Sequence, residues 1–406
     1  MKEERPNYPA LFKPAQLAKL QVKNRFVCSA TYECMATEAG EVTDGIVKRY
    51  RNLAKGDVGL IVPGLMYVHP LGQAIKHQLG IHDDRMIPGL RSLTEAVHQE
   101  GGKMVFQLAH AGRQTTKSVV GQTPIAPSDE GRDPVNFVKP KKMTEEQIRE
   151  VIQAFGKAAS RAIEAGADGI QIHAAHGYLV NQFLSPFFNR RTDYWGSSDE
   201  NRFRFLREIV LETRRVLPEG TPILAKLNTR DHTPQEGVTP PLATRYAKWL
   251  AELGIDGLEL SCGSTIYSTW NMSRGEVPVR EIVRGLPWWK KPLGRILMGR
   301  KVGRYDLQEA YNLEAAQMVK PVVGKVPVFL VGGLRRVSHM EEILEKGYAD
   351  FVSMSRPFIR EPFLVRRIKE GKTSVASCVS CNKCLAAELN GMPLRCYVKG
   401  LPSESS

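Results

Sequence analysis

Two histidines and a tyrosine stand together in the segment His173-Ala174-Ala175-His176-Gly177-Tyr178. Two imidazoles at this spacing can converge on one oxygen atom as hydrogen-bond donors and stabilise negative charge that develops on it. Tyr178 could then supply a proton as a general acid. Two other interpretations stay open. The histidines could bind a metal, although no third ligand with zinc-like spacing stands nearby, or they could simply pack in the core.

A phosphate site is indicated where two later apolar runs of the sequence end. Gly332 and Gly333 follow one run, and Arg356 follows the next. Glycines let a backbone approach a phosphate closely, and an arginine side chain can bind two of its oxygens. The alternative is a glycine turn and a surface arginine.

An amide and a cation follow two other apolar runs, at Gln107 and Lys226. The amide of Gln107 can both donate and accept hydrogen bonds. A flavin ring needs an amide partner for its pyrimidine edge and a positive charge near N1, which stabilises the reduced anion. Together with the phosphate site, this set fits FMN better than a bare sugar phosphate.

The seven cysteines are distributed unevenly. Cys28, Cys34 and Cys262 are scattered, whereas the other four crowd a short C-terminal segment. In a cytosolic protein such a cluster argues for metal binding rather than disulfides. Four thiolates at short spacing suit a [4Fe–4S] cluster and would also suit zinc; a remnant motif whose thiols merely pack is the third interpretation. The clustered cysteines are Cys378, Cys381, Cys384 and Cys396.

Eight short apolar runs must position these side chains. They are rich in Val, Ile and Leu and show little alternation, which is typical of parallel strands buried on both faces. Amphipathic stretches of helical length follow, so the pattern predicts an α/β fold, a (β/α)8 TIM barrel, with function at the carboxyl ends of the strands. An open doubly wound sheet is the rival, but no G-x-G-x-x-G follows the first run. The runs are 25–30, 58–63, 103–108, 169–173, 223–227, 257–261, 328–331 and 351–353.

The helical stretches are bounded by recognisable signals. Thr144 and Gln147 form a plausible capping box, and Gly166, Gly254 and Gly347 stand where helices should end. We therefore expect a barrel domain over residues 1–370 and a Cys-rich C-terminal extension over 371–406. The predicted helices span 87–100, 144–164, 201–216, 241–253, 305–319 and 337–346.

The composition is that of a globular protein, with 42% hydrophobic and 25% charged residues among 406. No apolar run approaches the roughly 20 residues that span a bilayer, and no secretory signal is visible, so we expect a cytoplasmic protein with no membrane partner. The formal charge is +14, and residues 274–304 alone carry +7. We interpret that stretch as a solvated basic loop or as a docking surface for phosphate or an acidic partner.

The chain resembles the Old Yellow Enzyme family of FMN-dependent oxidoreductases, also described as NADH:flavin oxidoreductases or NADH oxidases. It is most similar to the barrel domain of the branch that contains 2,4-dienoyl-CoA reductase and trimethylamine dehydrogenase. The resemblance covers nearly the whole chain. It rests on KNRFVCSATYE, KGDVGLIVPG, VFQLAHAGRQ, IQIHAAHGYLVNQFLSPFFNRRTDYWGSSDENRFRF, VFLVGGL and DFVSMSRPFI.

The resemblance implies roles for individual residues. His173 and His176 would bind the electron-withdrawing group of the substrate, and Tyr178 would be the proton donor. Gln107 would contact the pyrimidine edge. The four clustered cysteines resemble the iron–sulfur motif of the same branch. The remaining flavin contacts would be Ser29, Ala30, Thr31 and Gly64 beside the ring, with Gly332, Gly333, Ser355 and Arg356 at the phosphate.

Three departures from the family pattern bear on the chemistry. Tyr32 stands where many relatives have a Thr or Cys that tunes the flavin. Lys226 replaces a common Arg and so loses the bidentate fork. Ser355 replaces a usual Gly.

The function that we predict is FMN-dependent reduction of an activated alkene (an enone, enoate or enoyl thioester), with NADH or NADPH as reductant. An alternative keeps the flavin but passes electrons to dioxygen, a quinone or a partner protein. A basic nucleic-acid-binding protein is a remote alternative, because no recognised nucleic-acid motif accompanies the charge. We expect a small-molecule substrate, a homo-oligomer and no nucleic-acid partner; a separate electron-donor protein would explain the cysteine cluster.

Overall fold

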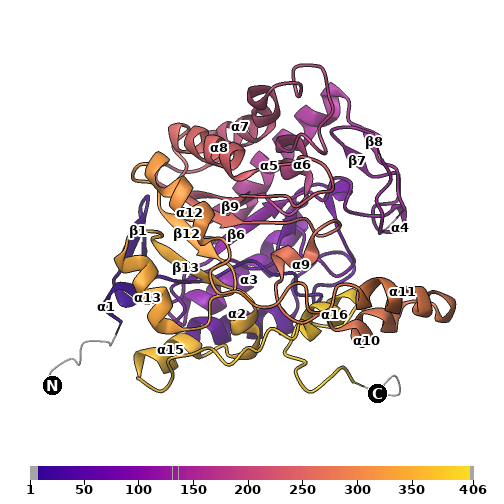
Figure 1. The fold of residues 1–406 in the computed structure, drawn as a ribbon. Coiled ribbons are helices and arrows are strands. Elements are labelled where there is room, and N and C mark those ends of the chain that lie inside the picture. The colour runs from indigo at the N-terminus through magenta and orange to yellow at the C-terminus, as the bar shows by residue number, and fades with distance from the viewer. Residues whose placement is uncertain (1–7, 130, 136, 403–406) are drawn as a thin grey trace.

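The computed structural model describes residues 8–129, 131–135 and 137–402; the outermost ends of the two predicted domains lie outside this part of the chain. Within it, the main sheet has nine strands in the order β4-β3-β13-β12-β11-β10-β9-β6-β5 (Figure 1). Neighbouring strands are parallel, and a bridge between Ile61 and Met104 joins β4 to β6, which closes the sheet. The predicted TIM barrel is confirmed.

Every predicted apolar run overlaps one barrel strand, and β6, β9, β10 and β13 each extend one residue beyond the predicted run. The strands are short, and nearly all of their residues are buried, because helices cover the outside and side chains fill the inside. The bounds are β3 Phe26–Cys28, β4 Leu60–Ile61, β6 Val105–Ala109, β9 Gly169–Ala174, β10 Ile223–Asn228, β11 Gly257–Ser261, β12 Val328–Val331 and β13 Phe351–Met354; β5, Met66–Tyr67, extends the edge beside β6.

A hairpin closes the amino-terminal end of the barrel. Strands β1 (Ala15–Leu17) and β2 (Leu20–Val22) are antiparallel. Their apolar side chains join a separate buried cluster with residues from the barrel strands, including Phe329 and Phe351, whose rings stack 4.3 Å apart. Because this end is filled with apolar side chains, polar chemistry is confined to the opposite, carboxyl end of the strands.

The outer helices confirm most of the predicted ones. Thr144 and Gln147 form both hydrogen bonds of the capping box, and Gly166, Gly254 and Gly347 adopt the left-handed conformation (φ +84°, +75° and +68°) that ends a helix. The principal helices of this layer are α2 Asp44–Lys55, α3 Ile87–His98, α5 Glu145–Glu164, α7 Asp199–Val216, α8 Pro240–Glu252, α12 Leu313–Val319, α13 Val337–Glu345 and α15 Leu364–Lys369.

The predicted helices need three corrections. Helices α2 and α15 were not predicted, although Ile46, Tyr50 and Leu53 of α2 form a buried stripe at helical spacing. The helix predicted over 305–319 begins only at Leu313. Residues 305–312 stay irregular because Ala310 has a left-handed backbone (φ +53°) and the Tyr311 hydroxyl donates to the carbonyl of Met272, 2.5 Å away.

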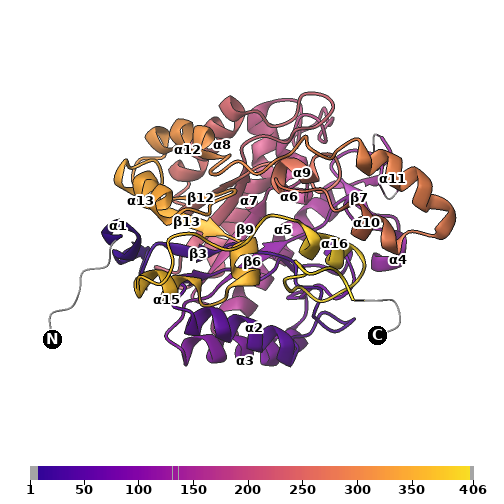
Figure 2. The same cartoon turned by 60° about the horizontal axis from the view of Figure 1, so that its bottom comes forward.

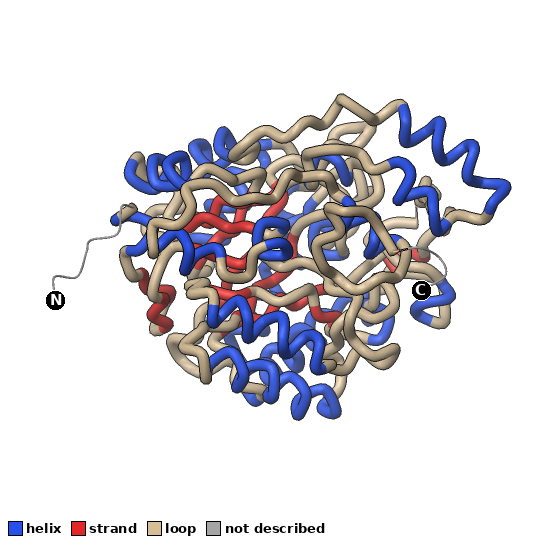
Figure 3. The backbone as a smooth tube through the Cα atoms, turned by 90° about the horizontal axis from the view of Figure 1, so that it is seen from below, coloured by secondary structure: helices blue, strands red, loops and turns tan. Residues whose placement is uncertain are grey.

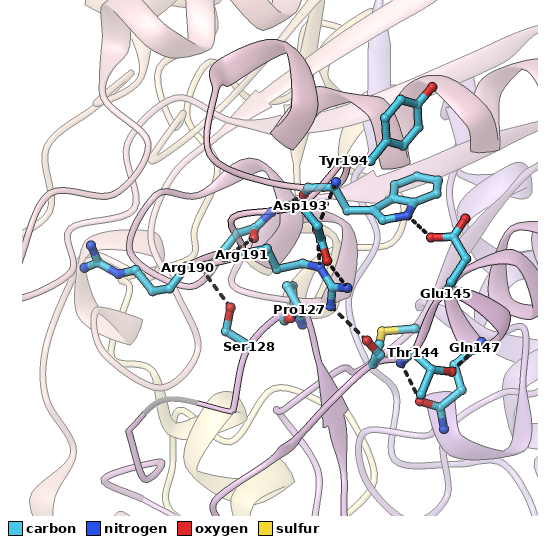
Figure 4. Close-up of polar contacts among 12 residues, drawn as sticks. Pro127, Ser128, Thr144, Glu145, Gln147, Arg190, Arg191, Asp193 and Tyr194 are labelled. Carbon is cyan, nitrogen blue, oxygen red and sulfur yellow. Dashed lines mark hydrogen bonds and ion pairs between the residues drawn. The ribbon is translucent and has the colours of Figure 1, made fainter.

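The long segment after β9 is held by a buried arginine (Figure 4). The Arg191 guanidinium binds both carboxylate oxygens of Asp193, at 2.9 and 2.7 Å. It also donates to the backbone carbonyls of Pro127 and Met143, at 2.9 and 2.8 Å. These contacts tie the segment to the loop before α5, which accounts for Arg191 and Asp193 in the sequence Asn189–Trp195.

The shorter elements lie in the connections. In Figures 2 and 3, the excursion after β11 that carries α10 and α11 stands out from the barrel, beside the C-terminal segment with α16. No helix in the described part of the chain is long and apolar enough to cross a bilayer. The remaining bounds are α1 Pro9–Phe12, α4 Lys117–Val120, β7 Ile125–Ala126, β8 Lys141–Lys142, α6 Leu179–Leu184, α9 Thr269–Met272, α10 Val279–Ile282, α11 Lys291–Gly299, α14 Arg356–Arg360 and α16 Lys383–Leu389, with 3-10 turns at Pro70–Gly72, Asp84–Met86, Val283–Gly285, Trp288–Lys290 and Lys320–Val322.

Replacing Arg191 with Ala should lower the free energy of unfolding by about 3 kcal/mol, because it leaves two buried carbonyls and Asp193 without their partner. Denaturant unfolding measures the change. The control is Arg207→Ala, which removes an exposed pair with Glu208 and should cost less than about 1 kcal/mol. Equal losses for the two variants would contradict the role that we assign to Arg191.

Candidate active site

A chain of buried polar side chains crosses the inside of the barrel. Lys226 Nζ on β10 donates to Ser29 Oγ at 2.8 Å and lies 3.3 Å from Glu259 Oε2 on β11. Gln171 Nε2 on β9 donates to the same Glu259 oxygen at 3.1 Å, and Gln107 Nε2 on β6 donates to Gln171 Oε1 at 2.6 Å. All five side chains are buried. This row of hydrogen-bonded side chains therefore fixes the predicted residues Ser29, Lys226 and Gln107 relative to one another.

The two predicted histidines and the tyrosine come together at the end of β9. The rings of His173 and His176 lie 5.2 Å apart, and the rings of His173 and Tyr178 lie 4.9 Å apart. His173 Nδ1 is buried and has no hydrogen-bond partner among the described residues, whereas His176 Nε2 lies 2.7 Å from Ser261 Oγ. The arrangement leaves His173 with an unused polar atom for a ligand.

The position of His176 is set by a second layer of side chains. Asn228 Oδ1 accepts from the His176 N–H at 3.1 Å, and its amide donates to Asp231 Oδ1 at 2.8 Å. Asn181 Oδ1 accepts from the Gly177 N–H at 2.7 Å. His176 itself has a left-handed backbone (φ +62°), which is uncommon for a residue with a side chain and is maintained by these bonds.

Burial keeps the two histidines neutral and Tyr178 protonated. The pKa of His173 is lowered well below its ordinary value by burial and then by the charge of Lys226. Burial and Lys226 lower the pKa of His176 in the same way. The pKa of the Tyr178 hydroxyl is raised by burial and then by the charge of Glu388, a residue of α16. The trio can therefore offer neutral imidazoles and a phenolic proton near neutral pH.

The predicted phosphate residues lie at the ends of β12 and β13. Gly332 and Gly333 have positive φ angles of +141° and +70°. A Cβ atom at Gly333 would come within 2.2 Å of the Gln308 carbonyl oxygen, so the close approach of that loop requires glycine. The backbone N–H groups of Gly332, Gly333 and Ser355 have no acceptor among the described residues. Free N–H groups on adjacent strand ends suit a phosphate.

Arg356 follows the end of β13, and its side chain contacts the cysteine segment. Its Nη1 donates to the Arg274 carbonyl at 2.8 Å and to Asn382 Oδ1 at 2.5 Å. Thr31 Oγ1 hydrogen-bonds with Ser355 Oγ, which places the loop after β3 beside this corner. Arg356 therefore lies between the predicted phosphate site and the C-terminal segment.

The other predicted contacts with the ring have varied surroundings. Ala30 is half-buried after β3. At Gly64, the missing side chain makes room for the buried Glu33 carboxylate, which accepts from the Gly64 N–H at 2.7 Å. The Tyr32 hydroxyl donates to the Lys76 carbonyl. The immediate neighbour of Gly64 in this structure is thus a carboxylate.

The four clustered cysteines line one small cavity, together with Arg356 and Asn382. Their thiols are free. No group of three or more His, Cys, Asp or Glu side chains in the described part of the chain is arranged to hold a metal ion. Burial raises the pKa of Cys384 to about 12, so that thiol is protonated. The four cysteines therefore lie around one cavity, but in the described part of the chain they are not grouped as metal ligands.

The barrel mouth fits a flavin on the evidence of its unused polar groups. An ammonium group carries three hydrogens. Lys226 donates one to Ser29 and forms an ion pair with Glu259 at 3.3 Å, so at least one hydrogen remains for a ligand. Buried polar groups are nearly always hydrogen-bonded, yet His173 Nδ1 and Gln114 Oε1 have no partner among the described residues. Gln114 lies beside His176, whose carbonyl accepts from its Nε2 at 2.8 Å.

Comparison with known proteins agrees with this geometry. The profile of the NADH:flavin oxidoreductase / NADH oxidase family matches residues 10–296 and 295–374. The chain belongs to this family. The resemblance to Old Yellow Enzymes is thereby confirmed, and the protein is an enzyme.

Three relatives illustrate how far the similarity extends. An NADH oxidase of Thermoanaerobacter brockii is 34% identical over 399 residues, which are 97% of this chain but 56% of that protein. A 4,4'-dithiodibutanoate disulfide reductase of Rhodococcus erythropolis is 31% identical, over 96% of this chain and 95% of that protein. A structure of 2-naphthoyl-CoA reductase with 2-naphthoyl-CoA has a TM-score of 0.84 at 26% identity, over 96% of this chain and 57% of that chain. The chain thus spans little more than half of the NADH oxidase and of the naphthoyl-CoA reductase, and nearly all of the disulfide reductase.

Several residues of the site were missed by sequence reasoning. Glu259 and Gln171 supply the middle of the buried chain, and Asp231 anchors the layer behind His176. The available signal was a polar residue inside an otherwise apolar strand, in Gly257-Leu258-Glu259-Leu260 and Ile170-Gln171-Ile172. Buried polar residues of this kind need a partner, so each one indicates a network.

Acidification should destabilise the protein through its buried histidines. Burial lowers the pKa of His110 to about 3, whereas an unfolded histidine titrates near 6.5. Below pH 6.5 the unfolded state binds a proton that the folded state does not, so stability is lost as pH falls. Between pH 7 and 5, His110 alone should cost about 2 kcal/mol. The variant His110→Asn should show a shallower dependence in urea unfolding; an unchanged slope would contradict this assignment.

Proposed function

We propose that this enzyme uses FMN and a nicotinamide to reduce an activated alkene, such as an enone, enoate or enoyl thioester. When bound, FMN would supply the hydride-transfer chemistry between NADH or NADPH and the β-carbon of the alkene. The observation that carries the proposal is the group of His173, His176 and Tyr178. His173 lies on β9 and the other two follow its end, and β9 pairs with β10, the strand that supplies Lys226.

The histidines would bind the substrate oxygen. Both are neutral, so each can donate one hydrogen bond, and His173 Nδ1 has no competing partner among the described residues. Hydrogen-bond donors fixed before the reaction stabilise enolate charge without having to reorganise. Ser261, 2.7 Å from His176 Nε2, orients the second ring. These contacts would polarise the carbonyl and orient the alkene.

Tyr178 would protonate the α-carbon. Its phenol stays protonated because burial raises its pKa, and its ring lies 4.9 Å from that of His173. A donor held beside the oxygen-binding group can reach a carbon two bonds away, which is the geometry that general acid catalysis requires.

The flavin would be held by the residues around the mouth. Lys226 would place its remaining N–H and its charge at the pyrimidine edge, beside the amide of Gln107. Ser29, Ala30, Thr31 and Gly64 would surround the ring. The N–H groups of Gly332, Gly333 and Ser355, together with Arg356, would bind the phosphate.

The electron acceptor is the least constrained part of the proposal. One relative is named as a disulfide reductase and another as an NADH oxidase. The histidine pair favours an acceptor whose carbonyl oxygen is conjugated to the reacting bond, as in an activated alkene. Dioxygen has no carbonyl, and the carboxylates of dithiodibutanoate are separated from its disulfide by methylene groups. Anaerobic oxidation of the reduced enzyme by an enone, a disulfide and a quinone, compared at equal concentrations, separates these alternatives. Fastest oxidation by the disulfide or the quinone would overturn the alkene assignment.

We further infer that Cys378, Cys381, Cys384 and Cys396 bind a [4Fe–4S] cluster, supplied with electrons by a separate donor protein. The support is that all four line one cavity beside Arg356. Because the thiols are not arranged as metal ligands here, their segment would have to close around the cluster. Zinc is the alternative for four thiolates, and a remnant motif is the other.

Removal of the proton donor should slow one half-reaction only. In Tyr178→Phe, oxidation of the reduced flavin by enone should fall by about 10²- to 10⁴-fold, whereas reduction by the nicotinamide should be unchanged. His173→Ala should slow the same step by about 10²- to 10³-fold through loss of a donor to the developing charge. Anaerobic stopped-flow absorbance measures both steps. Unchanged oxidation in both variants would contradict the assignment.

Iron analysis tests the cysteine cluster. Protein prepared anaerobically with iron should contain about four iron and four sulfide per chain. Cys381→Ala should lose both and keep its flavin, while Cys262→Ala, a buried cysteine outside the cluster, should retain them. Iron-free parent protein with full enone activity would show that the four cysteines are a remnant.

A further inference from the structure

The excursion after β11 exposes an unusual amount of apolar surface. Trp288 and Trp289 are 82% and 62% exposed, and Leu293, Ile296 and Leu297 on α11 are exposed as well. No residue of α11 is buried. The three α11 residues recur at helical spacing and so form one apolar stripe that continues the tryptophan pair. In Figures 1 and 2, this helix stands away from the barrel.

Basic residues surround the apolar stripe. Residues 274–304 carry a net charge of +7, half of the +14 of the whole chain. Lys290, Arg295 and Arg300 are exposed beside or among the apolar side chains. No acidic residue occurs between Glu281 and Asp306. The charge is therefore not neutralised by the stretch itself.

The base of the excursion is anchored to the rest of the fold. Glu281 on α10 pairs with Lys383 on α16 at 3.5 Å, and its carbonyl accepts from Asn390 Nδ2 at 2.9 Å. Val283 is buried. The apolar stripe thus projects from a fixed base, so its exposure is a feature of the fold and not of a frayed end.

We propose that α11, with Trp288 and Trp289, docks the enzyme on the surface of an anionic lipid bilayer. An apolar helical face flanked by Lys and Arg, with tryptophan at its end, suits the boundary between headgroups and acyl chains. The cations attract anionic headgroups while the apolar side chains enter the boundary layer. This revises the expectation, drawn from the missing spanning segment, that no membrane is a partner.

Two other occupants fit the observations less well. In a two-fold dimer through this face, each +7 stretch would meet its own copy, and like charges repel. An acidic soluble protein would match the charge, but transient electron-transfer contacts are small. They would leave much of a projecting apolar stripe in water. An anionic bilayer offers headgroups to the basic residues and an apolar layer to the exposed stripe.

Vesicle sedimentation of the flavin-loaded, full-length enzyme tests the proposal. It should bind vesicles of phosphatidylcholine and phosphatidylglycerol, but not phosphatidylcholine alone, and binding should weaken as salt rises beyond about 0.15 M. Arg295→Glu with Arg300→Glu should lower the partition coefficient at least about 25-fold. The matched control is Lys325→Glu with Lys346→Glu, which makes the same charge change in the loop that follows α12 and its 3-10 turn, and at the end of α13. Helices α12 and α13 lie on the side opposite α11 in Figure 1, so the control should lower the partition coefficient less than about three-fold.

Tryptophan fluorescence locates the contact. Trp288 and Trp289 should shift to the blue on anionic vesicles and be quenched by brominated lipid. The variant Trp288→Phe with Trp289→Phe should still sediment but lose the shift, because Trp195 and Trp270 are buried and Trp249 packs against the hydrophobic core. Failure to bind anionic vesicles at low salt, or binding without a tryptophan shift, would overturn the proposal. So would a soluble oligomer that the Arg295 and Arg300 changes convert to a monomer.

Discussion

A buried ion pair between Lys226 and Glu259 is the constraint on which the interior of this barrel depends. Charges removed from water cost several kcal/mol each unless they are paired and hydrogen-bonded. Here the carboxylate also accepts from Gln171, and the ammonium donates to Ser29. Because each partner comes from a different strand, the pair fixes the polar groups at the mouth relative to one another. An amide, a hydroxyl and one unused N–H of the cation are thereby held ready for a ring-shaped ligand.

The proposed substrate-binding residues are also positioned by buried polar side chains, but these form a second network. Asp231 is fully buried, and Asn228 connects it to the backbone of His176. This layer holds a backbone conformation that a histidine rarely adopts, and in doing so it brings His176 beside His173. Lys226 belongs to both sides, since its charge also helps to keep the two imidazoles neutral. In the proposed reaction, one cation therefore serves both the flavin site and the substrate site.

Much of this arrangement could be predicted from the sequence, for a physical reason. Buried parallel strands are almost wholly apolar, so all eight barrel strands were recognisable, and their ends indicated His173, His176 and Tyr178. Spacing along the chain does not show which polar side chains meet across a barrel, so Glu259, Gln171 and Asp231 were missed. Residues 305–312 looked helical but are held irregular by contacts with distant segments, such as Tyr311 with Met272. In residues 274–304 the sequence indicated only the charge. It could not show that Trp288 is exposed, because this depends on whether another segment packs over it in the fold.

Binding of FMN to the flavin-free protein tests most directly whether Lys226, held by its buried pair with Glu259, binds the flavin. The variants are Lys226→Met, and Lys226→Met combined with Glu259→Leu, in which the buried pair becomes an apolar contact and the barrel should stay folded. Both variants should bind FMN at least about ten-fold more weakly than the parent, since each lacks the charge-assisted contact with the ring. Fluorescence titration gives the dissociation constants. A folded double variant that binds FMN as tightly as the parent would contradict the account.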